Sequence, residues 1–142
     1  MNILYDHMIS VTEYNQLREA VGWGSLPAVQ AQIGINRSDY VIRAMDGKRT
    51  IGMARVVSDG GCSVFILDVI VLPEYQGHGI GKSIFQNIMN YLQKELQQRG
   101  SMNIGLMAAK GREGFYQQFG FLERPNEGMG AGMTMRLRSE KI

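Results

Sequence analysis

The chain has 142 residues, 44% of them hydrophobic and 20% charged, which is typical of one globular domain with a real core. A formal net charge of +2 without a dense run of Lys or Arg argues against a nucleic-acid-binding protein. The single cysteine, Cys62, excludes an intramolecular disulfide and a multi-cysteine zinc site, and no segment reaches the roughly 20 apolar residues of a membrane span.

We therefore expect a single domain over residues 1–142, with no membrane segment, no nucleic-acid partner and no bound metal. The first residues include Asp6 and His7 and lack the basic start and long apolar run of a signal peptide. The expected compartment is the cytoplasm.

In chain order, the first predicted elements are a strand over residues 2–9 and two helices. Residues 12–23 space their apolar side chains helically and open with a threonine, Thr12, as a possible N-cap. Residues 25–34 predict a second short helix, from a serine cap to a glycine stop.

Three strands are predicted next, between residues 39 and 72. Asp46-Gly47 and the run Asp59-Gly60-Gly61 supply the tight turns that separate them. The third of these strands, residues 63–72, is nearly all apolar, as expected of a strand that is covered on both faces.

The second half of the chain predicts a long helix, a strand, a short helix and a last strand. From Ile80 to Leu96 an isoleucine or leucine recurs every four positions, which indicates a helix of about 18 residues that ends at Gly100. Residues 101–109 and 131–139 read as strands, and residues 111–121 as a short helix between them. The order β-α-α-β-β-β-α-β-α-β defines a mixed α/β (α+β) domain.

The stretch LPEYQGHGIGKSIF places Gly77, Gly79 and Gly81 where the long helix must begin. The first N–H groups of a helix lack internal partners and carry partial positive charge, so an anion is their natural ligand. Glycines let a phosphate approach the backbone closely, and Gln76 and Lys82 add side-chain donors. The alternative is a tight turn without a ligand. The spacing matches neither the P-loop nor the dinucleotide fingerprint.

Two motifs of this chain resemble the GNAT superfamily of N-acetyltransferases. VIVLPEYQGHGIGKSIF is similar to its acetyl-CoA loop, Arg/Gln-x-x-Gly-x-Gly/Ala, through Gln76, Gly79 and Gly81. FYQQFGF resembles a second signature, Leu/Phe-Tyr-x-x-x-Gly-Phe, through Tyr116 and Gly120. The resemblance covers roughly residues 38–138 and implies the GNAT fold, a mixed central sheet of about six to seven strands flanked by about four helices.

The resemblance implies an enzyme that moves an acetyl group from acetyl-CoA to a primary amine of a small molecule by direct attack, without metal. Backbone N–H groups of the loop would hold the pyrophosphate, the end of the preceding strand would bind the pantetheine arm, and Tyr116 would serve as general acid. The implied cofactor-binding residues are Val69, Ile70, Val71, Gln76, Gly77, His78, Gly79, Ile80, Gly81, Lys82, Ser83 and Tyr116. For Tyr116 the alternative is a core aromatic beside two phenylalanines.

An attacking alkylamine must first lose a proton, which costs on the order of 4–5 kcal/mol at neutral pH. Asp68 is the acid on the strand before the loop and is our candidate for the general base, the alternative being a structural carboxylate. His78 is a weaker candidate because its place in the loop favours solvent or phosphate. Glu74 is expected to be solvated, and Glu127 lies in a Gly-rich loop that could line an acceptor pocket.

The acceptor side is the part that the sequence defines least. Trp23 lies between Gly22 and Gly24 and reads as a mobile cap that suits an aromatic or alkyl amine, although it could also be core. Ala109 stands where many family members carry an asparagine, which removes an expected contact to the pantetheine arm. A catalytically silent CoA-binding module remains the alternative function, and the alternating strand at the C-terminus fits either a monomer or a homodimer.

Overall fold

The structure is a computed structural model that describes residues 1–139, and its internal contacts divide it into two units. The first unit comprises Met1–Leu106, and the second begins at Met107. The elements of the first unit are β1 (Ile3–Asp6), α1 (Val11–Ala20), α2 (Ala28–Asn36), β2 (Tyr40–Asp46), β3 (Arg49–Ser58), β4 (Ser63–Val71), the 3-10 turn η1 (Pro73–Tyr75), α3 (Ile80–Arg99) and β5 (Asn103–Leu106).

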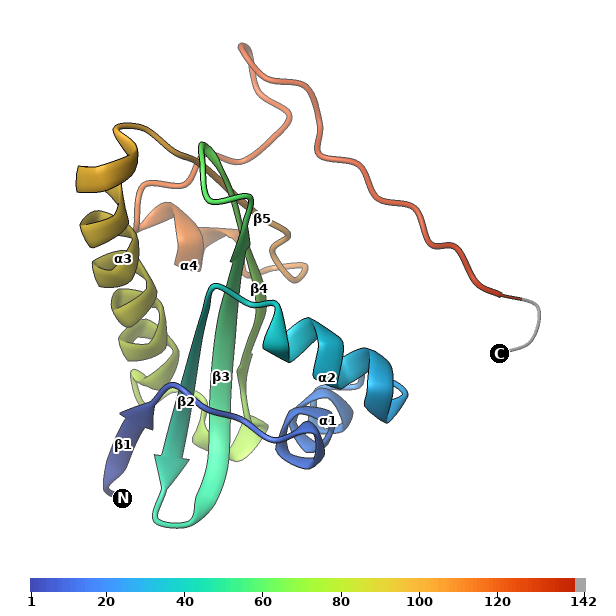
Figure 1. The fold of residues 1–142 in the computed structure, drawn as a ribbon. Coiled ribbons are helices and arrows are strands. Elements are labelled where there is room, and N and C mark those ends of the chain that lie inside the picture. Colours follow the sequence, from blue (N-terminus) through green and yellow to red (C-terminus); the bar gives the residue numbers. More distant parts are fainter. Residues whose placement is uncertain (140–142) are drawn as a thin grey trace. The chain divides into compact units, whose positions relative to one another are not determined.

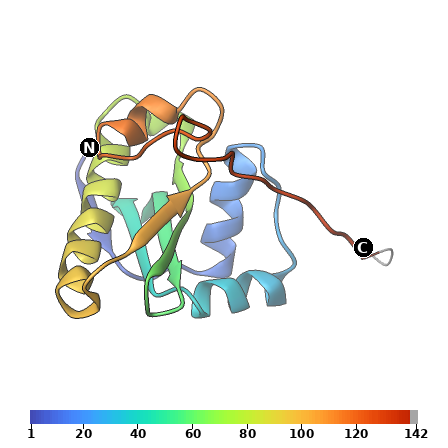
Figure 2. The same cartoon turned by 90° about the horizontal axis from the view of Figure 1, so that it is seen from above.

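A five-stranded mixed sheet with the order β1-β2-β3-β4-β5 forms the centre of the first unit. The first four strands are antiparallel neighbours, and β5 returns parallel to β4 after the crossover through α3. Helix α3 covers one face of this sheet, and α1 and α2 cover the other (Figures 1 and 2). The expected α/β (α+β) class is confirmed, and residues 1–139 contain four helices as predicted, α4 being in the second unit.

The core between the sheet and α3 follows from the four-residue repeat in the sequence. Ile80, Ile84, Ile88 and Leu92 are all at most 4% exposed and lie on one stripe of α3. Gly52 on β3 makes this approach possible, because a Cβ at that position would lie 2.9 Å from the Ile70 carbonyl oxygen and 3.0 Å from Ile84 Cδ1. The long helix ends at Gly100, whose φ of 87° only glycine adopts readily.

Several predicted boundaries are wrong at the N-terminal end. The first strand covers Ile3–Asp6 rather than residues 2–9. Helix α1 is capped by Ser10 instead of Thr12, because the Ser10 hydroxyl accepts from the Glu13 N–H while the Glu13 carboxylate accepts from the Ser10 N–H. Helix α2 begins after Pro27 without a side-chain cap.

The predicted last strand is also wrong, and the sheet has five strands in the described residues rather than six to seven. Residues 131–139 belong to no ladder, and the side chains of Met133, Met135 and Leu137 are 79–87% exposed. A strand exists only where its backbone pairs with a neighbour, so alternation in the sequence alone did not produce one.

The second unit contains the helix α4 (Glu113–Gln117) and an irregular segment after it. Tyr116 on α4 is 9% exposed and packs edge-on against Phe115 at a ring distance of 5.1 Å. The Phe121 ring lies 6.3 Å from that of Tyr116. The motif FYQQFGF therefore forms a local aromatic cluster.

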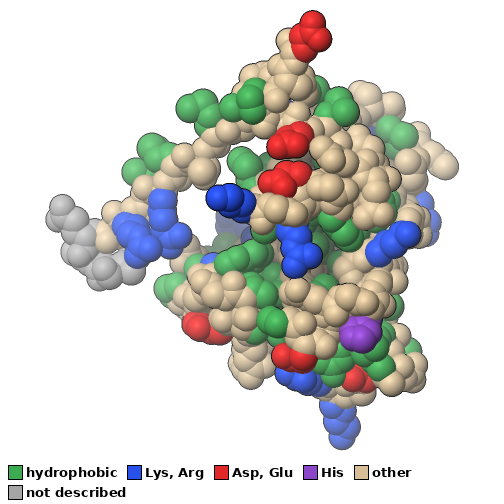
Figure 3. Space-filling view, turned by 180° about the vertical axis from the view of Figure 1, so that it is seen from behind, with side chains coloured by type: hydrophobic (Ala, Val, Ile, Leu, Met, Phe, Trp, Pro, Cys, Tyr) green, Lys and Arg blue, Asp and Glu red, His purple; other side chains and the backbone are tan. Residues whose placement is uncertain are grey.

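On the face drawn in Figure 3, acidic and basic side chains are interspersed, and no continuous basic surface covers it. No helix among residues 1–139 is both long enough and apolar enough to cross a bilayer. Within the same residues, no group of three or more His, Cys, Asp or Glu side chains is arranged to hold a metal ion.

Candidate functional site

The first feature of the site is the end of β4, where the strand loses its neighbour. The parallel pairing of β4 with β5 stops at Ile66–Leu106, so residues 67–71 extend beyond it without a partner from β5. Leu72 donates its N–H to the Ile51 carbonyl at 2.9 Å, which directs the alternate residue Val71 away from β3. The backbone of Val71 thus faces the side that β5 leaves open.

A β-bulge interrupts β4 just before this point. Met53 pairs with Ile70 and Arg55 with Leu67, so Asp68 and Val69 together oppose one residue of β3. Asp68 has a φ of 55° and is the single non-glycine residue in the described chain with positive φ. A bulge of this kind turns the strand and redirects its side chains.

The glycine loop follows η1 and leads directly into α3. Gly77 and Gly79 have φ values of 81° and 79°, and Gly79 is the N-cap of α3 without a side-chain cap. A Cβ at either glycine would meet nothing within 4 Å, so the space above the loop is open. Gly81 is the second residue of α3 and has ordinary helical geometry. The first N–H groups of a 20-residue helix are therefore presented to this space, with no acidic residue in the first turn.

Side chains around the loop hold it against the sheet. Gln76 donates its side-chain amide to the Val71 carbonyl at 2.9 Å, across the open side of β4. Tyr75 donates to the Asp46 carboxylate at 2.6 Å and Arg49 to Glu74 at 2.7 Å, so the β2–β3 turn supports η1. The side chains of His78 and Lys82 are exposed, and Ser83 donates its N–H to the Gly79 carbonyl at 3.1 Å.

Asp68 lies in a cluster of charged and polar side chains on the face of the sheet that α1 and α2 cover. Its Oδ2 accepts from the Tyr14 hydroxyl and from Arg55 Nε, each at 2.7 Å. Its Oδ1 lies 3.6 Å from an Arg18 guanidinium nitrogen. Burial, and then the bond to the Asp68 carboxylate, raise the pKa of Tyr14, so this phenol stays protonated and remains a donor.

The predicted cap residue Trp23 belongs to the same neighbourhood. The Arg18 guanidinium lies 5.8 Å from the centroids of both the Trp23 and the Tyr14 rings. Arg18 Nε donates to the Gly24 carbonyl at 2.9 Å. Trp23 is 44% exposed and is therefore not a core residue.

Tyr116 lies in the second unit and is described there by itself. Burial raises the pKa of its hydroxyl above the ordinary value of 10.0, and Arg112 opposes this shift. At neutral pH the hydroxyl is therefore fully protonated, as a proton donor must be. Glu127 and Ala109, also in this unit, are exposed.

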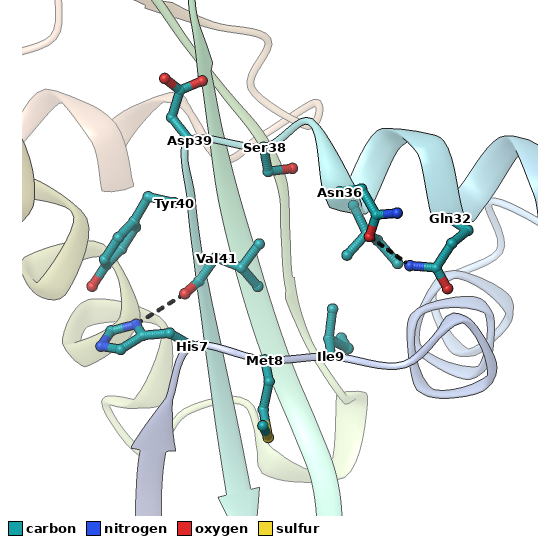
Figure 4. A pocket seen from close by; sticks show the side chains of 10 residues that line it. His7, Met8, Ile9, Gln32, Asn36, Ser38, Asp39, Tyr40 and Val41 are labelled. Carbon is teal, nitrogen blue, oxygen red and sulfur yellow. Dashed lines mark hydrogen bonds between the residues drawn. The ribbon is translucent and has the colours of Figure 1, made fainter.

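A separate pocket of about 390 Å³ lies on the outer part of the sheet, between the β1–α1 link, α2 and the start of β2 (Figure 4). His7 Nδ1 lies 3.0 Å from the Val41 carbonyl oxygen, and Gln32 donates to Asn36 at 2.8 Å. These side chains bind one another or the backbone, so the pocket does not gather a set of groups for chemistry. His7 therefore belongs to this pocket rather than to the cluster around Asp68.

Sequence reasoning singled out Asp68 and Trp23 but missed the residues that connect them, Arg18, Arg55 and Tyr14. The Tyr14 ring packs in the core at 2% exposure, while its hydroxyl reaches Asp68 on β4. One sequence signal could have revealed this cluster: Arg55 lies among apolar residues in the strand segment MARVV. A buried arginine needs an anionic partner, and the one acid on the next strand is Asp68.

The family to which the chain is similar was identified by comparison with known proteins. A family model for the acetyltransferase (GNAT) domain matches residues 37–123. An uncharacterised N-acetyltransferase (ycf52) of Porphyra purpurea is 33% identical over 122 residues, which cover 83% of this chain and 68% of that protein. The chloroplastic GCN5-related N-acetyltransferase 2 of Arabidopsis thaliana is 33% identical over 138 residues, covering 82% of this chain and 52% of the relative.

A solved structure gives the same result for the fold. A probable acetyltransferase of unknown function from methicillin-resistant Staphylococcus aureus superposes with a TM-score of 0.83 at 28% identity, over 96% of this chain and all of the other. Two Arabidopsis thaliana relatives are named chloroplastic, so a cytoplasmic location stays a prediction. The glycine loop at the end of a bulged strand and these similarities together show that the chain belongs to the GNAT family and is an acetyltransferase.

Proposed function

We propose that this protein transfers the acetyl group of acetyl-CoA to the primary amine of a small molecule by direct attack. The observation that carries the proposal is the uncapped N-terminus of α3, entered through Gly77 and Gly79, at the end of a strand with an open edge. This supports a ligand that combines a diphosphate with an extended amide-containing arm, as CoA does.

The loop suits a diphosphate for two reasons. The left-handed backbone at Gly77 and Gly79 turns successive N–H groups toward one side, and the space where their Cβ atoms would lie is open. The dipole of α3 adds partial positive charge there, and Lys82 and Gln76 can add side-chain donors. Charge-assisted hydrogen bonds contribute roughly 1.5–3 kcal/mol each, so four or five would hold the diphosphate firmly.

The open edge of β4 suits the pantetheine arm. Peptide-like groups bind a free strand edge by continuing its ladder, and residues 69–71 offer such an edge past the end of β5. Gln76 already occupies the Val71 carbonyl, so binding there would exchange one amide donor for another. A free N–H on this edge would polarise the acetyl carbonyl and stabilise the oxyanion as the amine attacks.

Tyr116 is proposed as the general acid, on the basis of the family motif and its protonated, buried hydroxyl. The amine nitrogen forms a bond to the acetyl carbon, the carbon–sulfur bond breaks, and the sulfur takes the Tyr116 proton. Transfer from a phenol of pKa above 10 to a thiolate of about 8.5 is unfavourable, so it must be coupled to the proton that the amine releases. That proton returns the phenolate to its starting state.

Before it attacks, the protonated amine must lose one proton to solvent or to a base, and this proton is separate from the one that later returns to the Tyr116 phenolate. Asp68 is the candidate from the sequence, and it would have to act while its carboxylate is bonded to Tyr14 and Arg55. The thioester supplies the driving force, because a thiol is a better leaving group than an amine.

The proposal is tested by ligand binding and by release of free thiol. We expect acetyl-CoA at 100 times its dissociation constant to stabilise the protein by about 2.7 kcal/mol. Gly79→Glu should abolish this shift through steric block and like charge. Gly60→Glu is the matched control, since Gly60 has a similar φ of 84° and open surroundings but lies in the β3–β4 turn.

Turnover is then measured with n-butylamine, phenethylamine, spermidine and a lysine-containing peptide as acceptors. Thiol release with one of the small amines supports the proposal, and release with the peptide alone makes the acceptor a protein. Binding without release from any of them would leave a CoA-binding module without activity, the alternative function. If Gly79→Glu binds acetyl-CoA as Gly60→Glu does, the loop is not the diphosphate site.

A further inference from the structure

The carboxylate of Asp68 is surrounded by donors. Its side chain is 10% exposed, and those of Arg18 and Arg55 are 16% and 15% exposed. Tyr14 and Arg55 both bind Oδ2, while Arg18 faces Oδ1. One carboxylate thus meets two guanidinium groups and a phenol, so its lone pairs are directed at protein donors rather than at a ligand.

The backbone of Asp68 adds to this picture. A left-handed φ is uncommon for a residue with a side chain, and aspartate tolerates it better than most. The bulge points the carboxylate toward α1, where Tyr14 and Arg18 are one helical turn apart. The residue with the unusual backbone conformation, Asp68, is therefore the one whose carboxylate reaches α1 from β4.

Arg18, which faces Asp68, also contacts the segment that contains Trp23. Besides facing Asp68, it donates Nε to the Gly24 carbonyl at 2.9 Å and lies 3.5 Å from the Trp23 carbonyl through a terminal nitrogen. The same guanidinium lies beside the Trp23 ring. Gly22 and Gly24 on either side have φ values of 83° and 76°. Backbone hydrogen bonds also hold the segment, since the Trp23 N–H donates to the Arg18 carbonyl at 2.9 Å and the Gly22 N–H to the Glu19 carbonyl at 3.1 Å. The Arg18 guanidinium adds the contact to the Trp23 ring itself.

We propose that Asp68 and Arg18 form a latch that holds the cap segment, residues 22–24, beside the bulge of β4 and so positions the acceptor amine. In this role Asp68 is a positioning residue, not the base, and Arg18 transmits its effect to Trp23. The proposal rests on the proposed function, since it assigns the acceptor side of that reaction.

The latch can be observed directly because Trp23 is the single tryptophan of the chain. Intrinsic fluorescence and its quenching by acrylamide therefore report on the cap alone, without substrate. Asp68→Asn and Arg18→Gln each remove one partner of the ion pair between Asp68 and Arg18. Arg37→Gln removes an exposed arginine at the end of α2 and serves as the matched control.

Both latch variants should show emission shifted to longer wavelength and an acrylamide quenching constant raised about twofold or more, while Arg37→Gln resembles wild type. With the amine that turns over fastest, the KM for the acceptor should rise roughly tenfold, equivalent to about 1.4 kcal/mol. The KM for acetyl-CoA should change less than twofold. Arg18→Lys, which keeps the charge but not the fork of donors, should recover only part of the effect.

Three results would overturn the latch. One is unchanged quenching and acceptor KM in both variants. The second is loss of kcat in Asp68→Asn, with a changed pH profile but wild-type fluorescence, while Arg18→Gln stays active, which would make Asp68 the base. The third is equal effects in Arg37→Gln. Should wild type release no thiol with any amine, the proposed function fails, whereas the fluorescence comparison still decides the latch.

Discussion

Tyr116 shows how packing can set the chemical character of a residue, since burial outweighs the opposing charge of Arg112. The ring lies among Phe115 and Phe121, and this burial raises the pKa of the hydroxyl. A higher pKa makes the phenol a weaker acid but guarantees that it carries the proton at any pH near neutrality. In the proposed mechanism this hydroxyl donates a proton once per turnover, so it must start protonated, as the buried phenol is.

The role of Tyr116 is tested by Tyr116→Phe, which keeps the ring and removes the hydroxyl. If the hydroxyl protonates the leaving thiolate, kcat should fall by about 10²–10⁴, the usual contribution of general acid catalysis. Acetyl-CoA affinity should change little, since the interaction matters in the transition state. The measurement is steady-state thiol release, together with the dissociation constant for acetyl-CoA.

The matched control is Tyr91→Phe, which removes a phenol hydroxyl from the stacked pair that Tyr91 on α3 forms with Tyr40. It should leave kcat unchanged. Full turnover in Tyr116→Phe would make the tyrosine a packing residue and leave proton donation to water. Weaker binding of acetyl-CoA at unchanged kcat would mean that it positions the ligand instead.

At the level of elements, local signals predicted the long helix and the three central strands but not their edges. The apolar repeat of α3 and the Gly100 stop are both visible in the sequence, because they depend on neighbours within a few residues. The cap at Ser10 also has a local signal, the capping-box spacing from Ser10 to Glu13, which the prediction of Thr12 as the cap overlooked. The bulge at Asp68 depends on the register with β3, which no local pattern encodes.

Gly52 is an element-scale constraint that the sequence did not reveal, and it can be tested by Gly52→Ala. A Cβ there would meet backbone at 2.9 Å and Ile84 Cδ1 at 3.0 Å, so α3 or β4 would have to move. Overpacking of this kind costs typically about 1–3 kcal/mol. Chemical denaturation should show this loss in the free energy of unfolding.

Gly34→Ala, in α2, is the control for Gly52→Ala. A Cβ at Gly34 meets only the Arg55 guanidinium, at 3.9 Å or more, and alanine favours the helix by about 0.5–1 kcal/mol. This variant should therefore be neutral or more stable. Equal stability of Gly52→Ala and wild type would show that α3 tolerates the added methyl group.

At the scale of the whole molecule, contacts between side chains far apart in the sequence were not predicted. Tyr14 and Asp68 are 54 positions apart and meet only because α1 lies over β4. The alternation in residues 131–139 predicted a strand, yet the described chain offers it no ladder partner. Motifs that act within one segment, such as the glycine loop, were readable, whereas contacts that depend on the stacking of layers were not.

Acid stability of the folded protein depends on another such long-range set, around Glu13. Burial alone would raise the pKa of Glu13, but hydrogen bonds from Thr50 and Ser10 and the charge of Arg43 outweigh it and lower the pKa from 4.5 to about 2. The Arg43 guanidinium binds Glu13 at 2.9 Å and also Asp6, so β1, α1, β2 and β3 meet at these side chains. The ionised carboxylate therefore favours the folded state.

Because the pKa of Glu13 is lower in the folded state, its contribution to stability is complete above the unfolded value of about 4.5 and is lost as the pH falls toward 2. The shift corresponds to at most about 3 kcal/mol, and to about 1–3 kcal/mol after allowance for solvent at a side chain 24% exposed. In thermal unfolding between pH 2 and 7, Glu13→Gln should be less stable than wild type at pH 7, and the two should converge toward pH 2. The amide of the Glu13→Gln variant does not titrate, so only the charge of the wild-type carboxylate can make the stability difference depend on pH. A stability difference that stays constant between pH 2 and 7 would therefore assign the loss to altered geometry of the cap at Ser10.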